Sequence, residues 1–182
     1  MTGAVDDRLG RRGRGRLGQP LRPAAQRRRL SRFQDAPMAR KPEASDPHDL
    51  QRFVDAQNPI IDGVCAELRR GRKTGHWMWF VFPQIKGLGF SAMANRYAIA
   101  SRAEAVAYLA HPVLGPRLRN STRLVTEVQG RTIGEIFGYP DALKFRSSMT
   151  LFAHVTGDSA VFTEAVLKYF AGVFDPETIN RL

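Results

Sequence analysis

The chain has 182 residues, which is enough for one domain with a hydrophobic core. No apolar run exceeds the six residues of 77–82, far fewer than the roughly 20 that span a bilayer. The single cysteine, Cys65, excludes an intrachain disulfide and a multi-cysteine metal site, and its apolar neighbours predict a buried, unreactive thiol. We therefore expect a cytoplasmic protein.

The net charge of +11 is concentrated at the N-terminus. Residues 1–41 contain 12 of the 28 Lys and Arg residues but only 3 of the 17 Asp and Glu residues, a balance of +9. Residues 42–182 therefore carry only +2. The whole-chain charge consequently says little about what the folded part binds.

Residues 1–45 are predicted to be a disordered leader ahead of a single domain at 46–182. The leader is rich in Arg, Gly and Pro, and it cannot bury enough apolar area to offset its ordering entropy. Its arginine clusters, within residues 8–32, predict weak, nonspecific affinity for nucleic acids, and they also imitate a transit peptide. A start-site artefact is the third interpretation, with Met38 as the true start.

Helix start and stop signals alternate along residues 46–182. Capping residues or helix-starting prolines stand at Asp46, Ser91, Ser101, Thr132, Pro140 and Asp175. Glycines typical of helix ends stand at Gly71, Gly130, Gly138 and Gly172. Ser101 and Glu104 also have the spacing of a capping box. The sequence therefore predicts an all-α fold, a compact bundle of about seven to eight short helices.

An aromatic run at residues 77–82 contains both tryptophans and is apolar at every position. Periodicity alone does not separate a buried strand from a buried helix in such a run. Because no other good strand is available to pair with it, we predict a short buried helix that ends before Pro83.

The candidate ligand-binding residues come from two segments, one around the tryptophans and one further along the chain. They are Arg72, Lys73, His76, Trp77, Trp79, Gln84, Lys144, Ser147 and Ser148. Indole rings stack on a base or sugar, and cations hold phosphate or carboxylate. If the two segments converge, they form an aromatic-walled pocket for a small anionic, nucleotide-like ligand.

His76, Lys144 and Ser148 are the candidate catalytic residues. A histidine exchanges protons near neutral pH, although His76 could equally be a polar residue at the edge of the core. Lys144 and Ser148 share a helix face at i, i+4 and could form an activated hydroxyl. The same residues also fit two donors to an anion, or an Asp141–Lys144 ion pair beside small packed side chains. The sequence does not decide whether the protein is an enzyme, and it indicates neither a cofactor nor a metal site.

Several motifs resemble the bacterial family called domain of unknown function 1810. They are FVDAQ (53–57), GRKTGHWMWFVFPQ (71–84), GLG (87–89), YLAHP (108–112) and KFRSSMTLF (144–152). The resemblance implies an all-helical single domain with no established activity. Gly75 stands where the family usually has Ser or a similar small residue. Some members carry the label calpastatin, but such inhibitors are disordered repeat proteins, and this chain has an aromatic core and no repeats.

A non-catalytic protein-interaction domain is the alternative function, with nucleic-acid affinity supplied by the leader. In that case the motifs serve packing, and we expect both tryptophans to be buried and the polar candidates to be dispersed over the surface.

Overall fold

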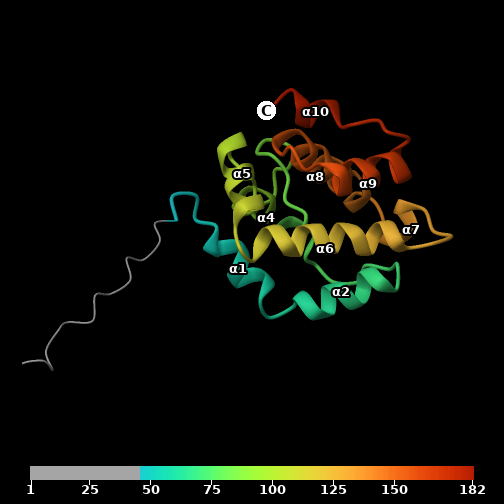
Figure 1. The fold of residues 1–182 in the computed structure, drawn as a ribbon. Coiled ribbons are helices and arrows are strands. Elements are labelled where there is room, and N and C mark those ends of the chain that lie inside the picture. Colours follow the sequence, from blue (N-terminus) through green and yellow to red (C-terminus); the bar gives the residue numbers. More distant parts are fainter. Residues whose placement is uncertain (1–45) are drawn as a thin grey trace, which may run out of the picture. The chain divides into compact units, whose positions relative to one another are not determined.

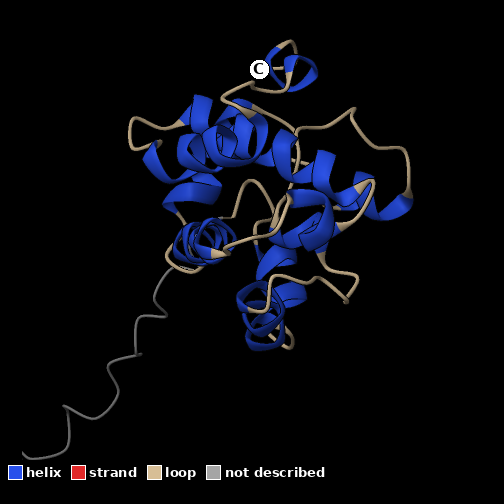
Figure 2. Cartoon of the chain, turned by 90° about the vertical axis from the view of Figure 1, so that its right-hand side faces the viewer, coloured by secondary structure: helices blue, strands red, loops and turns tan. Residues whose placement is uncertain are grey.

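A computed structural model of the protein describes residues 46–182. Within that range the chain forms ten α-helices and no β-strand (Figure 2). The helices are α1 Gln51–Gln57, α2 Ile61–Arg69, α3 Met78–Val81, α4 Ala92–Arg96, α5 Arg102–Ala110, α6 Leu114–Glu127, α7 Ile133–Phe137, α8 Asp141–Val155, α9 Ala160–Phe170 and α10 Pro176–Ile179.

The predicted all-α fold is confirmed. The helices number ten in the described range, rather than seven or eight, because α3, α4, α7 and α10 are single turns of four or five residues. The predicted leader at 1–45, its nucleic-acid affinity through residues 8–32 and a start at Met38 lie outside the described residues. No helix among residues 46–182 has both the length and the apolarity needed to cross a membrane.

Helix α6 runs through the middle of the domain, with α2 on one side and α8 and α9 on the other (Figure 1). Its buried residues include Leu118, Leu124 and Thr126, which lie on different sides of the helix, so the helix contributes to packing around much of its circumference. Helix α8 packs against α5, α7, α9 and α10. It is therefore braced along most of its length, and this holds its N-terminal face in place.

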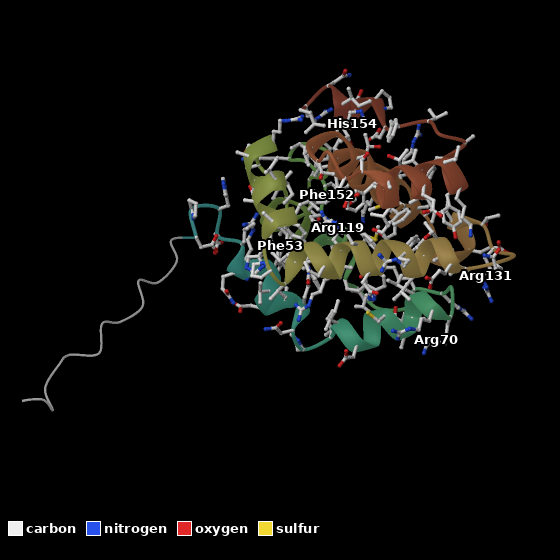
Figure 3. The ribbon with its side chains drawn as sticks, in the orientation of Figure 1. Phe53, Arg70, Arg119, Arg131, Phe152 and His154 are labelled. Carbon is white, nitrogen blue, oxygen red and sulfur yellow. The ribbon has the colours of Figure 1, made fainter. Side chains whose placement is uncertain are left out.

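The core is a chain of aromatic contacts. Phe53 of α1 meets the ring of Tyr108 edge-on at 5.1 Å, and Tyr108 lies 5.4 Å from Phe152 of α8. Phe53 and Phe152 point into the interior between the helices (Figure 3). Burial raises the pKa of the Tyr108 hydroxyl, which accepts a hydrogen bond from the amide of Gln57. These rings join the first helices of the domain to α8 across the whole core.

The predicted caps are mostly present. The hydroxyls of Ser91 and Ser101 accept hydrogen bonds from the backbone N–H of Ala94 and Glu104, at 3.1 and 3.2 Å. The capping box at Ser101 is incomplete, however, because the buried Glu104 carboxylate accepts from the N–H of Ala100 and pairs with Arg52. In the described residues the complete capping box lies at the start of α7 instead.

The aromatic run forms the predicted short buried helix, α3, which ends before Pro83. An isolated parallel β-bridge then joins Ile85 to Ile99. The N–H of Ile99 donates to the carbonyl oxygen of Gln84 at 2.8 Å, and the N–H of Lys86 donates to that of Ile99 at 2.9 Å. The bridge fixes the backbone that follows α3, and with it the position of Gln84.

Cys65 is only half-buried, contrary to the prediction of a buried thiol. It lies on α2 facing α6, where the amide nitrogen of Asn120 is 3.8 Å from its sulfur. The apolar neighbours in the sequence pack into the core, but the position itself lies at the edge of the α2–α6 contact.

Candidate functional site

A cavity of about 570 Å³ lies beside the N-terminal half of α8. Its walls come from α3, the segment 84–94, α8 with Pro140 before it, and α10 with Asp175 before it, and we refer to it as the α8 cavity. Four of the residues predicted from the sequence line it: Trp79, Gln84, Lys144 and Ser147. Further lining residues that the sequence did not indicate include Phe90, Ser91, Leu143, Arg146, Asp175 and Glu177.

One face of α8 forms the longest wall of the cavity. The lining residues Leu143 and Lys144 follow Pro140 by three and four residues, and Ser147 follows them by four and three. These spacings place all of them on the same side of the helix. The motif at 144–152 therefore contributes its first residues to the cavity, whereas Met149, Leu151 and Phe152 lie in the core.

Lys144 lies between a carboxylate and an aromatic ring. Its ammonium is 2.8 Å from Oδ1 of Asp141 and 4.9 Å from the centroid of the Trp79 ring. The second oxygen of Asp141 is 2.7 Å from the ammonium of Lys73. Two cations thus share one carboxylate, and this wall of the cavity keeps one net positive charge.

The pKa of Asp141 lies below its ordinary value. Burial raises it, but the hydrogen bonds and charges of Lys144 and Lys73 outweigh burial and stabilise the carboxylate. Lys73 itself stands behind the cavity wall, where its ammonium also donates to the carbonyl oxygen of Gly75 at 2.7 Å. Lys73 is therefore a positioning residue for Asp141 rather than a lining residue.

Glu67 of α2 holds the loop that leads into α3. Its carboxylate oxygen Oε2 accepts hydrogen bonds from the backbone N–H groups of Thr74 and Gly75 and from the indole Nε1–H of Trp77, at 2.7, 3.0 and 3.0 Å. Burial raises the pKa of Glu67, and these hydrogen bonds lower it further than burial raises it. The loop is therefore held from two sides: Glu67 binds it from α2, and Lys73 links it to Asp141 of α8.

The remaining predicted site residues do not join the cavity. His76 and Arg72 are exposed on the anchored loop, away from the lining residues. Trp77 is buried in the core at 2 % exposure, so it has no face for a ligand. Ser148 is also buried, and its hydroxyl has no hydrogen-bond partner among the described residues. Lys144 bonds Asp141 rather than Ser148, which matches the ion-pair interpretation.

Two polar residues that sequence reasoning missed stand at the other end of the cavity. Arg146 donates from Nε and Nη2 to the carbonyl oxygens of Val173 and Phe174, at 2.9 and 3.0 Å. Asp175 accepts from the hydroxyl of Ser147 at 2.7 Å. Arg146 belongs to the motif at 144–152, which is the sequence signal that points to it. For Asp175 the sequence predicts only a helix start.

The mouth of the cavity carries exposed apolar side chains. Phe90 is 90 % exposed and Leu143 is 50 % exposed, and both line the cavity. Tyr139, which is 86 % exposed, precedes the lining residue Pro140. Isolated exposed apolar residues are ordinary, but here an exposed phenylalanine and an exposed leucine line one cavity, and an exposed tyrosine is next to it in the sequence.

A second cavity, of about 530 Å³, surrounds Arg52. The guanidinium of Arg52 donates to four backbone carbonyl oxygens and to the carboxylate of Glu104. Its hydrogen-bonding capacity is consumed within the fold, which makes it a structural group that joins α1 to the segments around α4 and α5. The described residues contain no group of three or more His, Cys, Asp or Glu side chains arranged to hold a metal ion.

Comparison with protein families gives a match to the family described as "Protein of unknown function (DUF1810)", over residues 47–182. The chain belongs to the DUF1810 family. The matched range includes every helix and every residue of the α8 cavity.

A solved structure supports the fold of this DUF1810 domain. The conserved hypothetical protein Rv1873 from Mycobacterium tuberculosis is 57 % identical, with a TM-score of 0.75, and the match covers 75 % of this chain and 98 % of that one. Among curated proteins, none matches the chain. The predicted family membership is therefore confirmed, and neither comparison names a ligand or a reaction.

Proposed function

We propose that the DUF1810 domain binds a small anionic, nucleotide-like ligand in the α8 cavity. The observation that carries the proposal is the position of Lys144, whose ammonium lies over the Trp79 ring on a wall with one net positive charge. A cation and a half-buried indole on the same wall are suited to a ligand that combines a negative group with a flat ring.

Unused hydrogen-bonding groups in the cavity also support binding. The side-chain amide of Gln84 makes no hydrogen bond with another described residue, and neither does Nη1 of Arg146. An amide supplies both donors and an acceptor, and a guanidinium supplies donors only. These groups are available to the edge of a ring and to an oxyanion.

The proposal is binding rather than catalysis. His76 lies outside the cavity, and Ser148 is buried in the core without contact with the ammonium of Lys144. The candidate nucleophile and base are therefore separated, and a binding role needs only the groups that line the cavity.

The test measures binding of nucleoside monophosphates and diphosphates to the full-length chain by thermal shift and tryptophan fluorescence. A ligand at 100 times its Kd stabilises the native state by about 2.7 kcal/mol, which is readily detected. Stacking on Trp79 should change the fluorescence, and a Trp79→Phe variant, which keeps the buried Trp77, should lose that response.

Lys144→Gln and Lys86→Gln form a matched pair for the same experiment. Lys144→Gln should weaken binding about tenfold or more, because a charge-assisted contact is worth about 1.5–3 kcal/mol. Lys86→Gln removes an exposed lysine that does not line the α8 cavity, and it should leave the Kd unchanged. Equal effects of the two variants would mean that only the overall charge matters, and the proposed site would be rejected.

Two exposed rings, Phe90 in the cavity lining and Tyr139 next to the lining residue Pro140, favour a second candidate, a protein-interaction domain. Phe90 and Tyr139 leave most of their apolar area in water, and interfaces are enriched in such anchors. Absence of binding by every nucleotide, with capture of a partner that a Phe90→Ser, Tyr139→Ser variant loses, would favour this function. Nucleic-acid affinity through residues 8–32 is a separate prediction, and a chain that starts at Met38 should lose it.

A further inference from the structure

We infer that the ligand of the α8 cavity carries, in addition to its anionic group, an N–H donor on its ring that is received by the carboxylate of Asp175. This inference rests on the proposed function and names the class of ligand for the same site. It follows from how the polar groups at the two ends of the cavity are paired.

Asp175 has one satisfied oxygen and one free oxygen. Oδ2 accepts from the hydroxyls of Ser147 and Thr178, at 2.7 and 2.6 Å, whereas Oδ1 accepts no hydrogen bond from the described residues. The residue is half-buried and lines the cavity. This oxygen is not enclosed by the protein, so it is open to a donor from a ligand in the cavity.

No cation within the described residues neutralises Asp175. Arg146 lies beside it, but two of its nitrogens donate to the carbonyl oxygens of Val173 and Phe174 rather than to the carboxylate. The other acidic lining residue, Glu177, forms an ion pair of 2.6 Å with Arg181. Asp175 is thus the one lining carboxylate in the described structure that has no ion pair.

Lys144 and Ser147, the residue bonded to Asp175, are close together on one helix. Ser147, which is bonded to Asp175, follows Lys144 by three residues on α8, a rise of about 4.5 Å along the helix. An anionic group at Lys144 therefore leaves the ring of the same ligand within reach of Asp175. The amide of Gln84 adds a donor and an acceptor for the edge of that ring.

This pairing discriminates between ligands of similar size. An anion with acceptors only would face the Asp175 carboxylate with a second acceptor, which is repulsive. A ring with an exocyclic amine would instead form a charge-assisted hydrogen bond. Aminopurine and aminopyrimidine nucleotides have this combination of groups.

The test compares two nucleotides that differ only by that amine: adenosine 5′-monophosphate and purine riboside 5′-monophosphate. The full-length chain should bind the amine-bearing compound about tenfold more tightly, the value of a hydrogen bond to a charged acceptor. Asp175→Asn should reduce this preference to about threefold or less, because the acceptor loses its charge. Glu164→Gln, which removes an exposed carboxylate of α9 away from the cavity, should keep the full preference.

Asp175 also joins α10 to α8, so the Asn variant needs a structural control. Thr178→Val removes the other hydroxyl bonded to Asp175 and leaves the carboxylate in place. It should be destabilised in thermal unfolding and yet keep the preference for the amine. Loss of preference in Thr178→Val as well would assign the effect to the packing of α10 and overturn the inference.

The remaining outcomes separate this inference from the proposed function. If both nucleotides bind equally and Lys144→Gln weakens both, the site stands and the role of Asp175 is rejected. If neither nucleotide binds, nor any other compound of the panel, the proposed function fails and this inference fails with it.

Discussion

Lys73 and Asp141 form an ion pair of 2.7 Å that joins the loop before α3 to the first turn of α8. The two residues are far apart in the sequence, and each belongs to a different segment of the candidate site. Because Lys73 occupies one carboxylate oxygen, Lys144 meets the other with a charge that is only partly compensated. The pair therefore sets both the position of α8 and the charge of the cavity wall.

This arrangement predicts an acid-dependent loss of stability. The depressed pKa of Asp141 means that its carboxylate stabilises the fold above the unfolded-state pKa, and that this contribution disappears as the pH falls through the folded-state pKa. Asp141→Asn should lower the free energy of unfolding by about 1 kcal/mol at pH 7, a value discounted for solvent screening. At pH 3, below the ordinary value of 3.8, the difference from wild type should be smaller than at pH 7.

Urea denaturation of both proteins at the two pH values measures this effect. The comparison with Asp141→Asn isolates the residue from Glu67, whose pKa is also lowered and which adds to the acid sensitivity of both proteins. A difference that is the same at pH 7 and pH 3 would show that Asp141 acts through packing and not through its charge.

The approach of α5 to α6 predicts opposite effects of two Gly→Ala substitutions. A Cβ at Gly115 would lie 2.1 Å from the carbonyl oxygen of Leu109, whereas a Cβ at Gly63 in α2 meets no atom within 4 Å. Gly115→Ala should destabilise the domain by about 3 kcal/mol, because the backbone of α5 has to move. Gly63→Ala should stabilise it by about 0.5–1 kcal/mol through helix propensity.

The melting temperatures of the two glycine variants provide the measurement. Each variant serves as the control for the other, since both add one methyl group to a helix. Tolerance of Gly115→Ala would indicate that the first turn of α6 can shift away from α5, contrary to the close contact seen between them.

The two tryptophans should respond differently to replacement by phenylalanine. Trp77 is buried, and its indole N–H bonds Glu67, so Trp77→Phe leaves a partly buried carboxylate short of a donor. We expect a loss of about 2 kcal/mol in the free energy of unfolding. Trp79 lies in the cavity wall without an indole hydrogen bond among the described residues, so Trp79→Phe should cost less than about 1 kcal/mol. Equal losses in chemical denaturation would contradict the separation of a core tryptophan from a site tryptophan.

Most of the fold could be predicted because its helix boundaries are encoded locally. A serine or threonine cap acts through the next three residues, and Ser91, Ser101 and Thr132 all cap as predicted. Glu104 is the exception, since its partner Arg52 comes from α1 and is selected by the tertiary fold. The spacing of a capping box contains no information about such a distant competitor.

The candidate site could be predicted only in part, because residues on one segment need not face the same way. Trp77 and Trp79 are two residues apart, yet the first is buried in the core and the second lines the cavity. His76 belongs to the same motif, but its side chain is exposed and does not line the cavity. Asp175 enters the cavity through the packing of α10 on α8, a contact that no local pattern indicates.

Arg52 is expected to be the most sensitive arginine of the domain. Its removal would leave the buried Glu104 without its cationic partner and three carbonyl oxygens without a donor, those of His48, Arg96 and Ala98. The carbonyl oxygen of Asp49 keeps the backbone N–H of residue 52. Arg52→Ala should therefore lower the free energy of unfolding by about 3–5 kcal/mol, the typical cost of breaking a buried ion pair.

Arg102→Ala is the matched control, because the exposed Arg102 donates a single hydrogen bond, to the carbonyl oxygen of His154. It should cost less than about 1 kcal/mol. Guanidinium denaturation measures both variants. The double variant Arg52→Ala, Glu104→Ala separates the two costs. If it is as unstable as Arg52→Ala, the main cost is the loss of donors to the carbonyl oxygens and not the unpaired charge of Glu104.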